Sequence, residues 1–456
     1  MLFRYEEILK VTGGEAINSF SGTGVEQITT DSRLKTADSL FLAIPGETFD
    51  GHDYLAAAMA NGAVLLCIEK KSLGKLPAGA PAIAVDSTIA AYQRLAAFHR
   101  KRCGVKTIAL TGSSGKTSTK EMLRAIFEHV CGKEHVLATE GNTNNQIGVP
   151  QNLMRLTPAH QFCIIEMGTN HPGEIEPLSA AAEPDAALIV SIGRCHLEHL
   201  GSLEGVAREK AHIFQHLQPE GTAVIPAGAA GFDLMVQAAG KHSKLFFGTG
   251  ADFESIYKGG NIRGSSFELI DNRTGERALV EWNLSGAHQA ANAAGAAAVA
   301  ASFGIPLAEI AAGLANCSLP GMRMKLSEHG GAQWLNDAYN ANPDSMKATL
   351  NWLSDFADPS KLVLVLGDMR EVGELSEEVH VEILRLALEH FPGARIAAVG
   401  PYMVQAAERC RSEKIVSFPD SAAAAEGVRA MVHPGDLVFL KASRGTRLER
   451  VEPESK

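Results

Sequence analysis

A short glycine-rich stretch offers the clearest chemistry in this sequence. Residues 111–118 are TGSSGKTS, and they follow the apolar run KTIAL and precede the helix-like TKEMLRAIFEHV. A strand, a glycine turn and a helix place backbone N–H groups and the positive helix end around an anion. Lys116 adds an ammonium group, and Thr117 can offer its hydroxyl to Mg²⁺. We therefore predict that this loop binds the phosphates of ATP.

The loop is shorter than the common phosphate-binding pattern, which would require glycine where this chain has Leu110. A Ser/Gly helix start with a capping role is the alternative, but a lysine beside a threonine after a buried strand favours phosphate. The predicted ATP contacts in the loop are Thr111, Gly112, Ser113, Ser114, Gly115, Lys116, Thr117 and Ser118.

Magnesium bound to a triphosphate needs further oxygen ligands, and Glu166 is a candidate. It ends the apolar run FCIIE, and a carboxylate at the carboxyl end of a parallel strand faces the crevice that receives the phosphates. A lone glutamate at a strand end is more often solvated than bound to a metal. The polar, glycine-rich MGTNHPGEI that follows indicates a loop and favours the metal.

Composition narrows the class of protein. The 456 residues exceed what one hydrophobic core usually serves, and the 45% hydrophobic and 21% charged content is typical of a soluble enzyme. No apolar run is long enough to cross a bilayer, and the start, MLFRYEEILKVTGG, is unlike a signal peptide, so we expect a cytoplasmic protein without membrane insertion. A net charge of −10 argues against nucleic-acid binding. The seven scattered cysteines, never in C-x-x-C spacing, argue against a disulfide framework or structural zinc.

Apolar runs alternate with helical patterns in three regions, which predicts an α/β protein of three domains. Residues 1–85 form a small N-terminal α/β unit. Residues 86–317 alternate buried strands (KTIAL, FCIIEM, AALIVSI, GTAVIP) with helices, as in a doubly wound parallel sheet. Residues 318–456, with KLVLVLGD, RIAAVG and DLVFLKAS, predict a smaller Rossmann-like domain.

Further motifs are spread over nearly the whole chain. They are TTDSR, FDGHDYL, EGNTNNQIGVP, CHLEHLGSLEGVAREKAHIF, SGAHQAANAAGA, GMRMK, NDAYNANPDSM, LGDMREVGELS and KASRGTRLE. Together with the phosphate loop, they resemble the Mur ligases of bacterial peptidoglycan synthesis. Without that resemblance, most would be taken as polar turns or loops.

The resemblance implies substrate contacts in the first and second regions. Arg33 would face a diphosphate, small residues would bond uracil, and EGNTNNQIGVP would grip the muramoyl peptide. The residues implied for the UDP-linked substrate are Thr30, Asp31, Ser32, Arg33, Asp50, Gly51, His52, Thr143, Asn144, Asn145 and Gln146.

The resemblance also implies a second metal segment. His196 would bear on a second Mg²⁺, and Lys210 matches the lysine that is carbamylated in the family, so the implied metal residues are Thr117, Glu166, His196 and Lys210. Lys116, Lys210 and His196 would be the catalytic residues. A loop histidine and a solvated helix lysine are the alternatives for these two positions. His212 stands where many relatives carry glutamate.

Nucleotide and dipeptide contacts are implied in the second and third regions. His288, Asn292, Arg323 and Asp337 would contact ATP. Asn340, Asn342, Ser345, Ser443 and Arg444 would serve the incoming dipeptide. Gln289 replaces the family's usual asparagine, and Ala442 stands where glycine is more common.

The implied activity is ATP-dependent amide ligation. D-Alanyl-D-alanine would be joined to UDP-N-acetylmuramoyl-tripeptide through an acyl phosphate, for a cell wall that sustains shape and division. ATP, two Mg²⁺ ions and a carbamylated Lys210 would take part, and we expect a monomer. A folylpolyglutamate synthase-like ligase is one alternative, although some 100 residues precede the loop here. A binding protein gated by nucleotide is the other.

Overall fold

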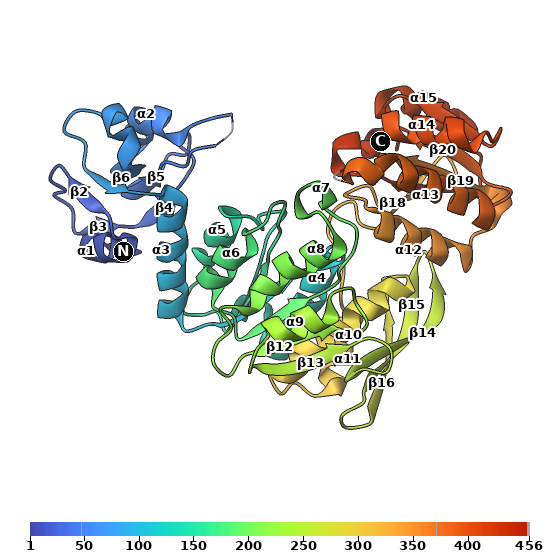
Figure 1. The fold of residues 1–456 in the computed structure, drawn as a ribbon, viewed down its shortest axis with the longest axis horizontal. Coiled ribbons are helices and arrows are strands. Elements are labelled where there is room, and N and C mark those ends of the chain that lie inside the picture. The colour runs from blue at the N-terminus through green and yellow to red at the C-terminus, as the bar shows by residue number, and fades with distance from the viewer. Residues whose placement is uncertain (47, 371, 454–456) are drawn as a thin grey trace.

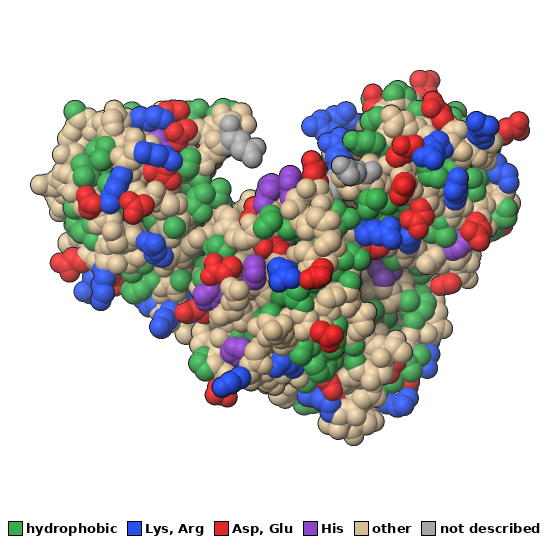
Figure 2. Space-filling model, viewed as in Figure 1, with side chains coloured by type: hydrophobic (Ala, Val, Ile, Leu, Met, Phe, Trp, Pro, Cys, Tyr) green, Lys and Arg blue, Asp and Glu red, His purple; other side chains and the backbone are tan. Residues whose placement is uncertain are grey.

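The computed structural model describes residues 1–46, 48–370 and 372–453, so position 371 of LGDMREVGELS lies outside the described residues. Figure 1 shows three domains in chain order, with the first and third standing apart above the central one. Figure 2 shows a wide notch between them, with histidine side chains gathered on the central domain beneath it. The predicted three-domain α/β class is confirmed.

The N-terminal domain is built on a five-stranded sheet in the order β2-β7-β6-β5-β4, parallel except for β2. Its strands are β2 (Glu15–Ile17), β4 (Gln27–Thr29), β5 (Ser39–Leu42), β6 (Ala63–Glu69) and β7 (Ala82–Val85). The remaining elements are the pair β1 (Phe3–Arg4) and β3 (Gly24–Val25), with helices α1 (Tyr5–Thr12) and α2 (Leu55–Ala60).

Helix α3 (Thr88–Cys103) joins the first two domains. Ser87 caps its start by accepting a hydrogen bond from the Ala90 amide at 3.2 Å, and Gly104 ends it with a left-handed φ of 67°. Its residue Leu95 is buried in the N-terminal core, while Ala96 is buried in the central one. The helix therefore belongs to both cores, and the boundary between residues 85 and 86 stays a prediction.

The central domain contains a nine-stranded sheet in the order β16-β15-β14-β13-β12-β11-β8-β10-β9. Its strands are β8 (Lys106–Thr111), β9 (Val136–Ala138), β10 (Phe162–Glu166), β11 (Ala186–Ile189), β12 (Thr222–Pro226), β13 (Ser243–Phe247), β14 (Phe253–Asn261), β15 (Gly264–Asp271) and β16 (Glu276–Trp282). The strands from β9 to β14 pair in parallel, as predicted, whereas β14, β15 and β16 form an antiparallel meander that we did not predict.

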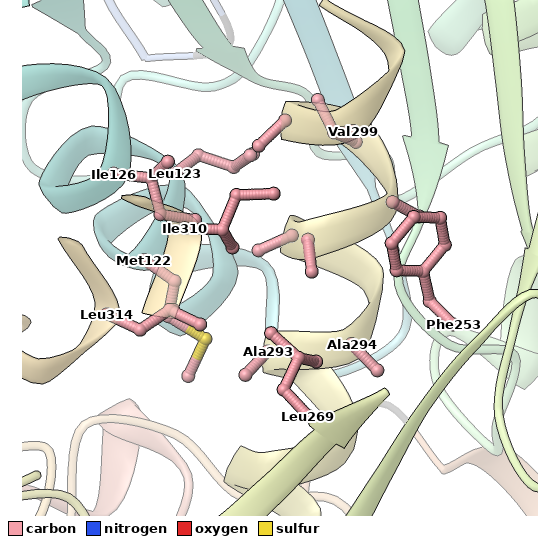
Figure 3. Close-up of a cluster of buried hydrophobic side chains, with 14 of the residues drawn as sticks. Met122, Leu123, Ile126, Phe253, Leu269, Ala293, Ala294, Val299, Ile310 and Leu314 are labelled. Atoms are coloured by element: carbon pink, nitrogen blue, oxygen red, sulfur yellow. The ribbon is translucent and has the colours of Figure 1, made fainter. Parts of the chain in front are cut away.

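Helices cover the central sheet. They are α4 (Lys116–Cys131), α5 (Gly148–Leu153), α6 (Ile175–Ala182), α7 (Leu197–Leu200), α8 (Leu203–Ala211), α9 (Phe232–Ala238), α10 (Ala287–Ser302) and α11 (Leu307–Ala315). Figure 3 shows α4, α10 and α11 packed together, with Phe253 and Leu269 of the meander against α10. Small side chains permit this close packing: a Cβ added at Gly313 of α11 would lie 2.6 Å from the Cα of Ile126 in α4.

The C-terminal domain has a six-stranded sheet in the order β17-β18-β22-β19-β20-β21, parallel apart from β17. Its strands are β17 (Lys325–His329), β18 (Ala332–Asn336), β19 (Leu362–Gly367), β20 (Arg395–Val399), β21 (Ile415–Phe418) and β22 (Leu437–Lys441). Its helices are α12 (Pro343–Ser354), α13 (Ser376–His390), α14 (Pro401–Cys410) and α15 (Ser421–Met431). Across the described chain, no helix combines the length and the apolar character that a bilayer span requires.

Candidate active site

The phosphate loop connects β8 to α4 and is held on two sides. The Ser113 amide donates to the Ser191 carbonyl at 3.0 Å, and the Lys116 ammonium donates to the Gly112 carbonyl at 2.7 Å. Gly115 has a left-handed φ of 77°, and a Cβ there would lie 2.8 Å from the Asn292 amide. The loop therefore needs glycine at this position, and Asn292 of α10 lies against the turn.

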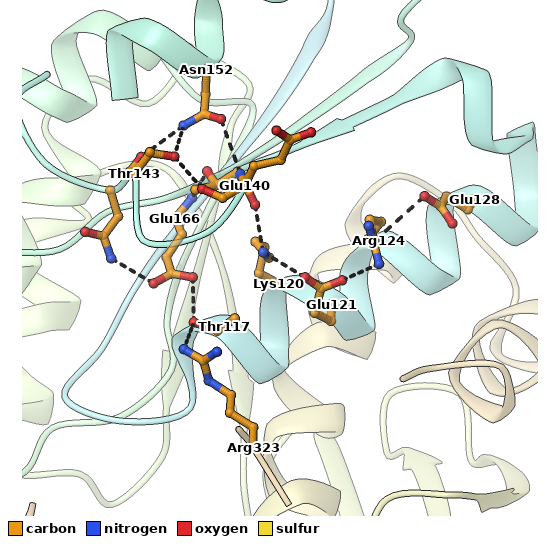
Figure 4. Close-up of polar contacts among 12 residues, drawn as sticks. Thr117, Lys120, Glu121, Arg124, Glu128, Glu140, Thr143, Asn152, Glu166 and Arg323 are labelled. Carbon is orange, nitrogen blue, oxygen red and sulfur yellow. Dashed lines mark hydrogen bonds and ion pairs between the residues drawn. The ribbon is translucent and has the colours of Figure 1, made fainter. Parts of the chain in front are cut away.

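A chain of hydrogen bonds links four predicted site residues, of which Thr117, Glu166 and Arg323 are labelled in Figure 4. The Thr117 hydroxyl donates to Glu166 Oε2 at 3.0 Å, and the Asn144 amide donates to Glu166 Oε1 at 2.9 Å. Arg323 in turn donates to the Thr117 hydroxyl at 3.0 Å. Glu166 is buried, so its carboxylate is directed inward rather than solvated. A hydroxyl and a carboxylate in contact form a donor set that suits a hard cation.

This donor set is incomplete without a ligand. Among the residues that the structure describes, no three His, Cys, Asp or Glu side chains converge as a metal cluster. Magnesium in nucleotide sites usually takes one or two protein oxygens and completes its shell with phosphate oxygens and waters. The pair Thr117 and Glu166 therefore fits Mg²⁺ that arrives with a nucleotide.

Lys210 of α8 is one of the largest fully buried side chains in the protein. Burial lowers the pKa of its ammonium to about 8, and the nearby charge of Lys116 adds to this effect. The charges of Cys195 and Lys116 both act on this group, so Lys210 lies within electrostatic range of the phosphate loop. His196 follows Cys195 directly and begins α7 with a left-handed φ of 51°. The structure thus brings Lys116 and Lys210 to one region, with His196 on the adjoining segment.

Glu209 fixes α8 to the loop that follows β10. Its carboxylate accepts hydrogen bonds from the backbone N–H groups of Gly173, Glu174 and Ile175 at 2.7, 3.0 and 2.9 Å. His212 has its Nδ1 3.4 Å from Glu209 Oε2. This anchoring holds Lys210 in place, and the sequence did not reveal it.

The predicted nucleotide contacts of α10 lie at its first turns. Burial lowers the pKa of His288 to about 4, so its imidazole is neutral near pH 7 and can exchange hydrogen bonds without charge. Gln289 accepts from the Asn292 amide at 3.5 Å. A cavity of about 180 Å³ opens between this helix start and the segment 317–325, and Gln289 and Arg323 line it.

Arg323 also lies against an aromatic ring. Its guanidinium carbon is 3.7 Å from the ring centroid of Tyr339, a cation–π contact that fixes the side chain over the site. Asp337 forms an ion pair with Lys441 of β22. The family resemblance pointed to Arg323 and Asp337 but not to their partners Tyr339 and Lys441, because each partner lies in a different motif.

Helix α12 of the C-terminal domain meets the phosphate loop. Asn342 caps the helix by accepting from the Ser345 amide at 2.8 Å, and its own amide donates to the Ser113 carbonyl at 3.3 Å. Asp344 accepts from the Arg194 amide at 2.8 Å. Asp344 lies within the NANPDSM stretch but was not predicted, and it ties the third domain to the loop after β11.

The other predicted dipeptide residues differ in accessibility. Ser443 is buried, accepts from the Arg370 amide at 2.9 Å and donates to the Ala341 carbonyl at 3.1 Å. Arg444 pairs with Glu449 at 2.7 Å, and Asn340 is exposed. Ser443 therefore orders the loop, whereas Arg444 and Asn340 remain accessible to a ligand.

The predicted muramoyl-peptide loop is ordered mainly by its own side chains. Asn152 donates to the Thr143 hydroxyl at 2.8 Å, and Asn145 Oδ1 accepts from the Gly148 amide at 2.9 Å. Gln146 donates to the Glu174 carbonyl at 2.5 Å. Of the four predicted residues, Asn144 is the one bonded to Glu166, and the others shape the loop.

The predicted uridine residues form two clusters in the N-terminal domain. Arg33 is exposed and bonds both Asp31 oxygens, at 2.8 and 2.7 Å, which lowers the pKa of Asp31 to about 2. Thr30 and Ser32 flank Asp31 in the same turn.

The second cluster is the turn at Asp50 and Gly51. His52 is buried, with Nδ1 2.6 Å from Asp50 and Nε2 accepting from the Glu69 amide at 2.9 Å. His52 therefore anchors this turn to β6, which leaves exposed groups such as Arg33 to meet a ligand.

Three family models match successive parts of the chain. The Mur ligase family catalytic domain matches residues 24–100, the Mur ligase middle domain 110–300, and the Mur ligase glutamate ligase domain 322–444. The UDP-N-acetylmuramoyl-tripeptide–D-alanyl-D-alanine ligase of Haemophilus influenzae is 37% identical over 79% of this chain and 77% of its own. The Bacillus subtilis enzyme of the same name is 32% identical over 97% of this chain and 95% of its own.

Solved structures agree over the full length. The crystal structure of MurF from Acinetobacter baumannii superposes with a TM-score of 0.90 at 32% identity, covering 98% of this chain and 97% of that one. MurF from Thermotoga maritima, in complex with ADP, gives 0.81 at 27% identity, covering 93% and 96%. Folylpolyglutamate synthase of Mycobacterium tuberculosis shares only the fold, at 18% identity and a TM-score of 0.63. Because family models match its three domains in order, and relatives 37% and 32% identical are covered over 77% and 95% of their lengths, the chain belongs to the Mur ligase family.

Proposed function

We propose that this Mur ligase joins D-alanyl-D-alanine to UDP-N-acetylmuramoyl-tripeptide and cleaves ATP to ADP and phosphate as it does so. The relatives that carry this activity in their names span nearly the whole chain. The observation that carries the chemistry is the contact of Thr117 and Asn144 with one buried carboxylate, Glu166, because it joins the phosphate loop to the predicted peptide loop.

The reaction proceeds in two transfers, because a carboxylate oxygen is a poor leaving group. The terminal carboxylate of the tripeptide attacks the γ-phosphorus of ATP, its bond to the β-γ bridging oxygen breaks, and ADP leaves. The amine of D-alanyl-D-alanine then attacks the acyl phosphate carbon, the amine loses a proton, and inorganic phosphate leaves with the carboxylate oxygen.

Two anions must approach each other in the first transfer, so electrostatic stabilisation dominates the catalysis. The N–H groups at the start of α4 and the Lys116 ammonium would face the transferring phosphoryl group. Lys116 can contribute about 4 kcal/mol at 4 Å for an effective dielectric constant near 20. Arg323 donates a hydrogen bond to Thr117, so its charge would add to that of Lys116 at the bound phosphates.

Residues for two Mg²⁺ ions are present in the chain. Thr117 and Glu166 would hold one, and His196 with a carbamate on Lys210 would bear on the other. Bound there, the ions would neutralise charge that develops on the phosphoryl oxygens.

Burial of Lys210 supports the carbamate. An unperturbed lysine is neutral in about one molecule in a few thousand at pH 7. With a pKa of about 8, roughly one in ten is neutral, and the neutral amine is the form that adds CO₂. A carbamate would also replace a buried cation by an oxygen ligand.

The remaining substrate groups fall to the outer domains. Arg33 and its neighbours would hold the uridine diphosphate, and Asn340 and Arg444 would meet the dipeptide. We propose that the protein acts as a monomer. Because its proposed substrates are ATP and a UDP-linked precursor, we propose that the reaction takes place in the cytoplasm.

Product mass tests this function. Purified protein is incubated with ATP, D-alanyl-D-alanine and either the lysine-containing or the diaminopimelate-containing UDP-tripeptide, and ADP is followed in parallel. We expect a pentapeptide product, with ADP formed only when both acceptor and dipeptide are present. Slow ATP hydrolysis indifferent to both would instead support a nucleotide-gated binding protein.

A further inference from the structure

We propose that Lys120 is a positioning residue that holds the peptide loop, residues 139–146, in register with the phosphate loop. The inference rests on the proposed function, and it assigns a role to a residue that no motif singled out. Lys120 lies one helical turn after Lys116 on α4, so both project from the same face of the helix.

Lys120 is a buried cation with specific partners. Its side chain is 3% exposed, its ammonium donates to the Thr139 carbonyl at 2.7 Å, and it pairs with Glu121 at 2.8 Å. Glu121 is buried as well and pairs with Arg124 at 2.7 Å. Burying such a pair costs free energy that an apolar pair of similar volume would avoid. We therefore infer that the buried Lys120 ammonium has a role other than stabilising the hydrophobic core.

The role follows from Thr139, because this residue is hydrogen-bonded both to Lys120 of α4 and to Glu166 at the end of β10. Its hydroxyl accepts a hydrogen bond from the Glu166 amide at 3.0 Å, and its amide donates to the Ile164 carbonyl at 3.0 Å. Lys120 is thus hydrogen-bonded to Thr139, the residue whose hydroxyl holds the backbone N–H of Glu166. Figure 4 shows Lys120 between Glu121 and the strand end, with Glu166 and Thr117 alongside.

The peptide loop begins at Thr139 and has no regular secondary structure before α5. Asn152 holds its middle by donating to the Thr143 carbonyl at 2.9 Å. Asn144 reaches Glu166 from the same loop. Lys120 is therefore the link between the start of the loop and the helix that carries the phosphate-binding residues, and it is too buried to touch a ligand itself.

Loss of this link should misplace the acceptor carboxylate relative to ATP while leaving ATP binding intact. In Lys120→Met we expect kcat/KM for the UDP-tripeptide to fall about 100-fold, the cost of a shift of about 1 Å in a reacting group. The dissociation constant of ADP should stay within about twofold, because the phosphate loop keeps its contacts. Lys120→Arg, which retains a charged donor, should recover about a tenth or more of the activity.

A double variant separates positioning from stability. Lys120→Met leaves Glu121 buried beside a methionine, and it can lower the unfolding temperature for that reason alone. Lys120→Met/Glu121→Gln removes both charges and should restore the unfolding temperature, yet it should remain slow, because the Thr139 carbonyl still lacks its donor. Amide hydrogen exchange should then be faster in residues 140–146 than in the wild type, with α4 unchanged.

The exposed Lys133→Met, on the segment before β9, is the matched control and should behave as the wild type in every measurement. A double variant with wild-type kcat, KM and loop exchange would overturn the role of Lys120. Failure of the wild-type protein to make the pentapeptide would overturn the proposed function instead, so the two failures are distinguishable.

Discussion

Arg323 donates a hydrogen bond to the Thr117 hydroxyl at 3.0 Å, although the two residues are 206 positions apart in the chain. Thr117 opens the helix of the phosphate loop, and Arg323 precedes the first strand of the C-terminal domain. The bond therefore places a positive charge of the third domain at the oxygen pair that Mg²⁺-nucleotide would use. It also shows that the segment just before β17 reaches the helix that follows the phosphate loop.

Arg323→Ala should lower the rate of ADP formation about 100-fold, the usual cost of removing one donor to a developing oxyanion. Binding of the UDP-tripeptide without nucleotide, measured by calorimetry, should be unchanged. Arg277→Ala, at an exposed pair with Glu268 on the meander, is the control. A rate within threefold of the wild type would show that Arg323 does not act on the phosphates.

Lys116→Met should reduce ADP formation to about a thousandth or less, because the ammonium and the loop amides act on the same charge. The UDP-tripeptide should still bind with its wild-type dissociation constant, since its predicted contacts lie in other segments. ADP formation at a near wild-type rate in this variant would remove the phosphate loop from the mechanism.

Lys210→Ala should be inactive and should regain part of its activity when short carboxylates are added, because they can replace the carbamate oxygens. In the wild-type protein, reactivation by bicarbonate after acid treatment should quicken as the pH rises towards about 8, where the Lys210 amine loses its proton. Intact mass at neutral pH should show an adduct of one CO₂. An unmodified mass together with no rescue by carboxylates would exclude the carbamate.

Asn342→Asp separates capping from domain contact at the start of α12. Aspartate caps helices as well as asparagine does, so the unfolding temperature should change little. It cannot donate to the Ser113 carbonyl, and it adds a negative charge beside the phosphate loop. We expect kcat to fall at least about tenfold, by the loss of one hydrogen bond of 1–1.5 kcal/mol together with the added repulsion. Unchanged kcat would show that this contact plays no part in turnover.

Local patterns predicted the fold well where the chain alternates buried strands with helices. The runs KTIAL, FCIIE and GTAVIP became β8, β10 and β12, because parallel strands buried on both faces are continuously apolar. The meander of β14, β15 and β16 was missed, since its strands are half exposed and contain glycine and charged residues. The double membership of α3 was also hidden, because contacts on both sides of a helix are not visible in its pattern.

The site was predictable where a motif carries its own geometry, as in the pairing of Thr117 with the strand-end Glu166. The contact partners that come from distant segments of the chain could not be predicted. Asp344, Tyr339 and Lys120 all make contacts between separate elements of the fold. No spacing rule in the sequence predicts that a lysine donates a hydrogen bond to a carbonyl 19 positions away. The resemblance to Mur ligases compensated for part of this, since it named Arg323 and Asp337.

Gly313→Ala tests the close packing of α11 on α4. Helix propensity alone favours alanine by about 1 kcal/mol, so a stabilising change would be expected on an exposed helix. At this position the added Cβ would lie 2.6 Å from the Ile126 Cα, which is backbone and cannot rotate away. We expect a net loss of about 1–3 kcal/mol and a thermal midpoint lower by several degrees, measured by calorimetry. The neighbouring exposed Ala312→Gly should cost no more than about 1 kcal/mol through propensity. A raised midpoint for Gly313→Ala would mean that the two helices can separate without cost, and that their contact does not set the position of the phosphate-loop helix.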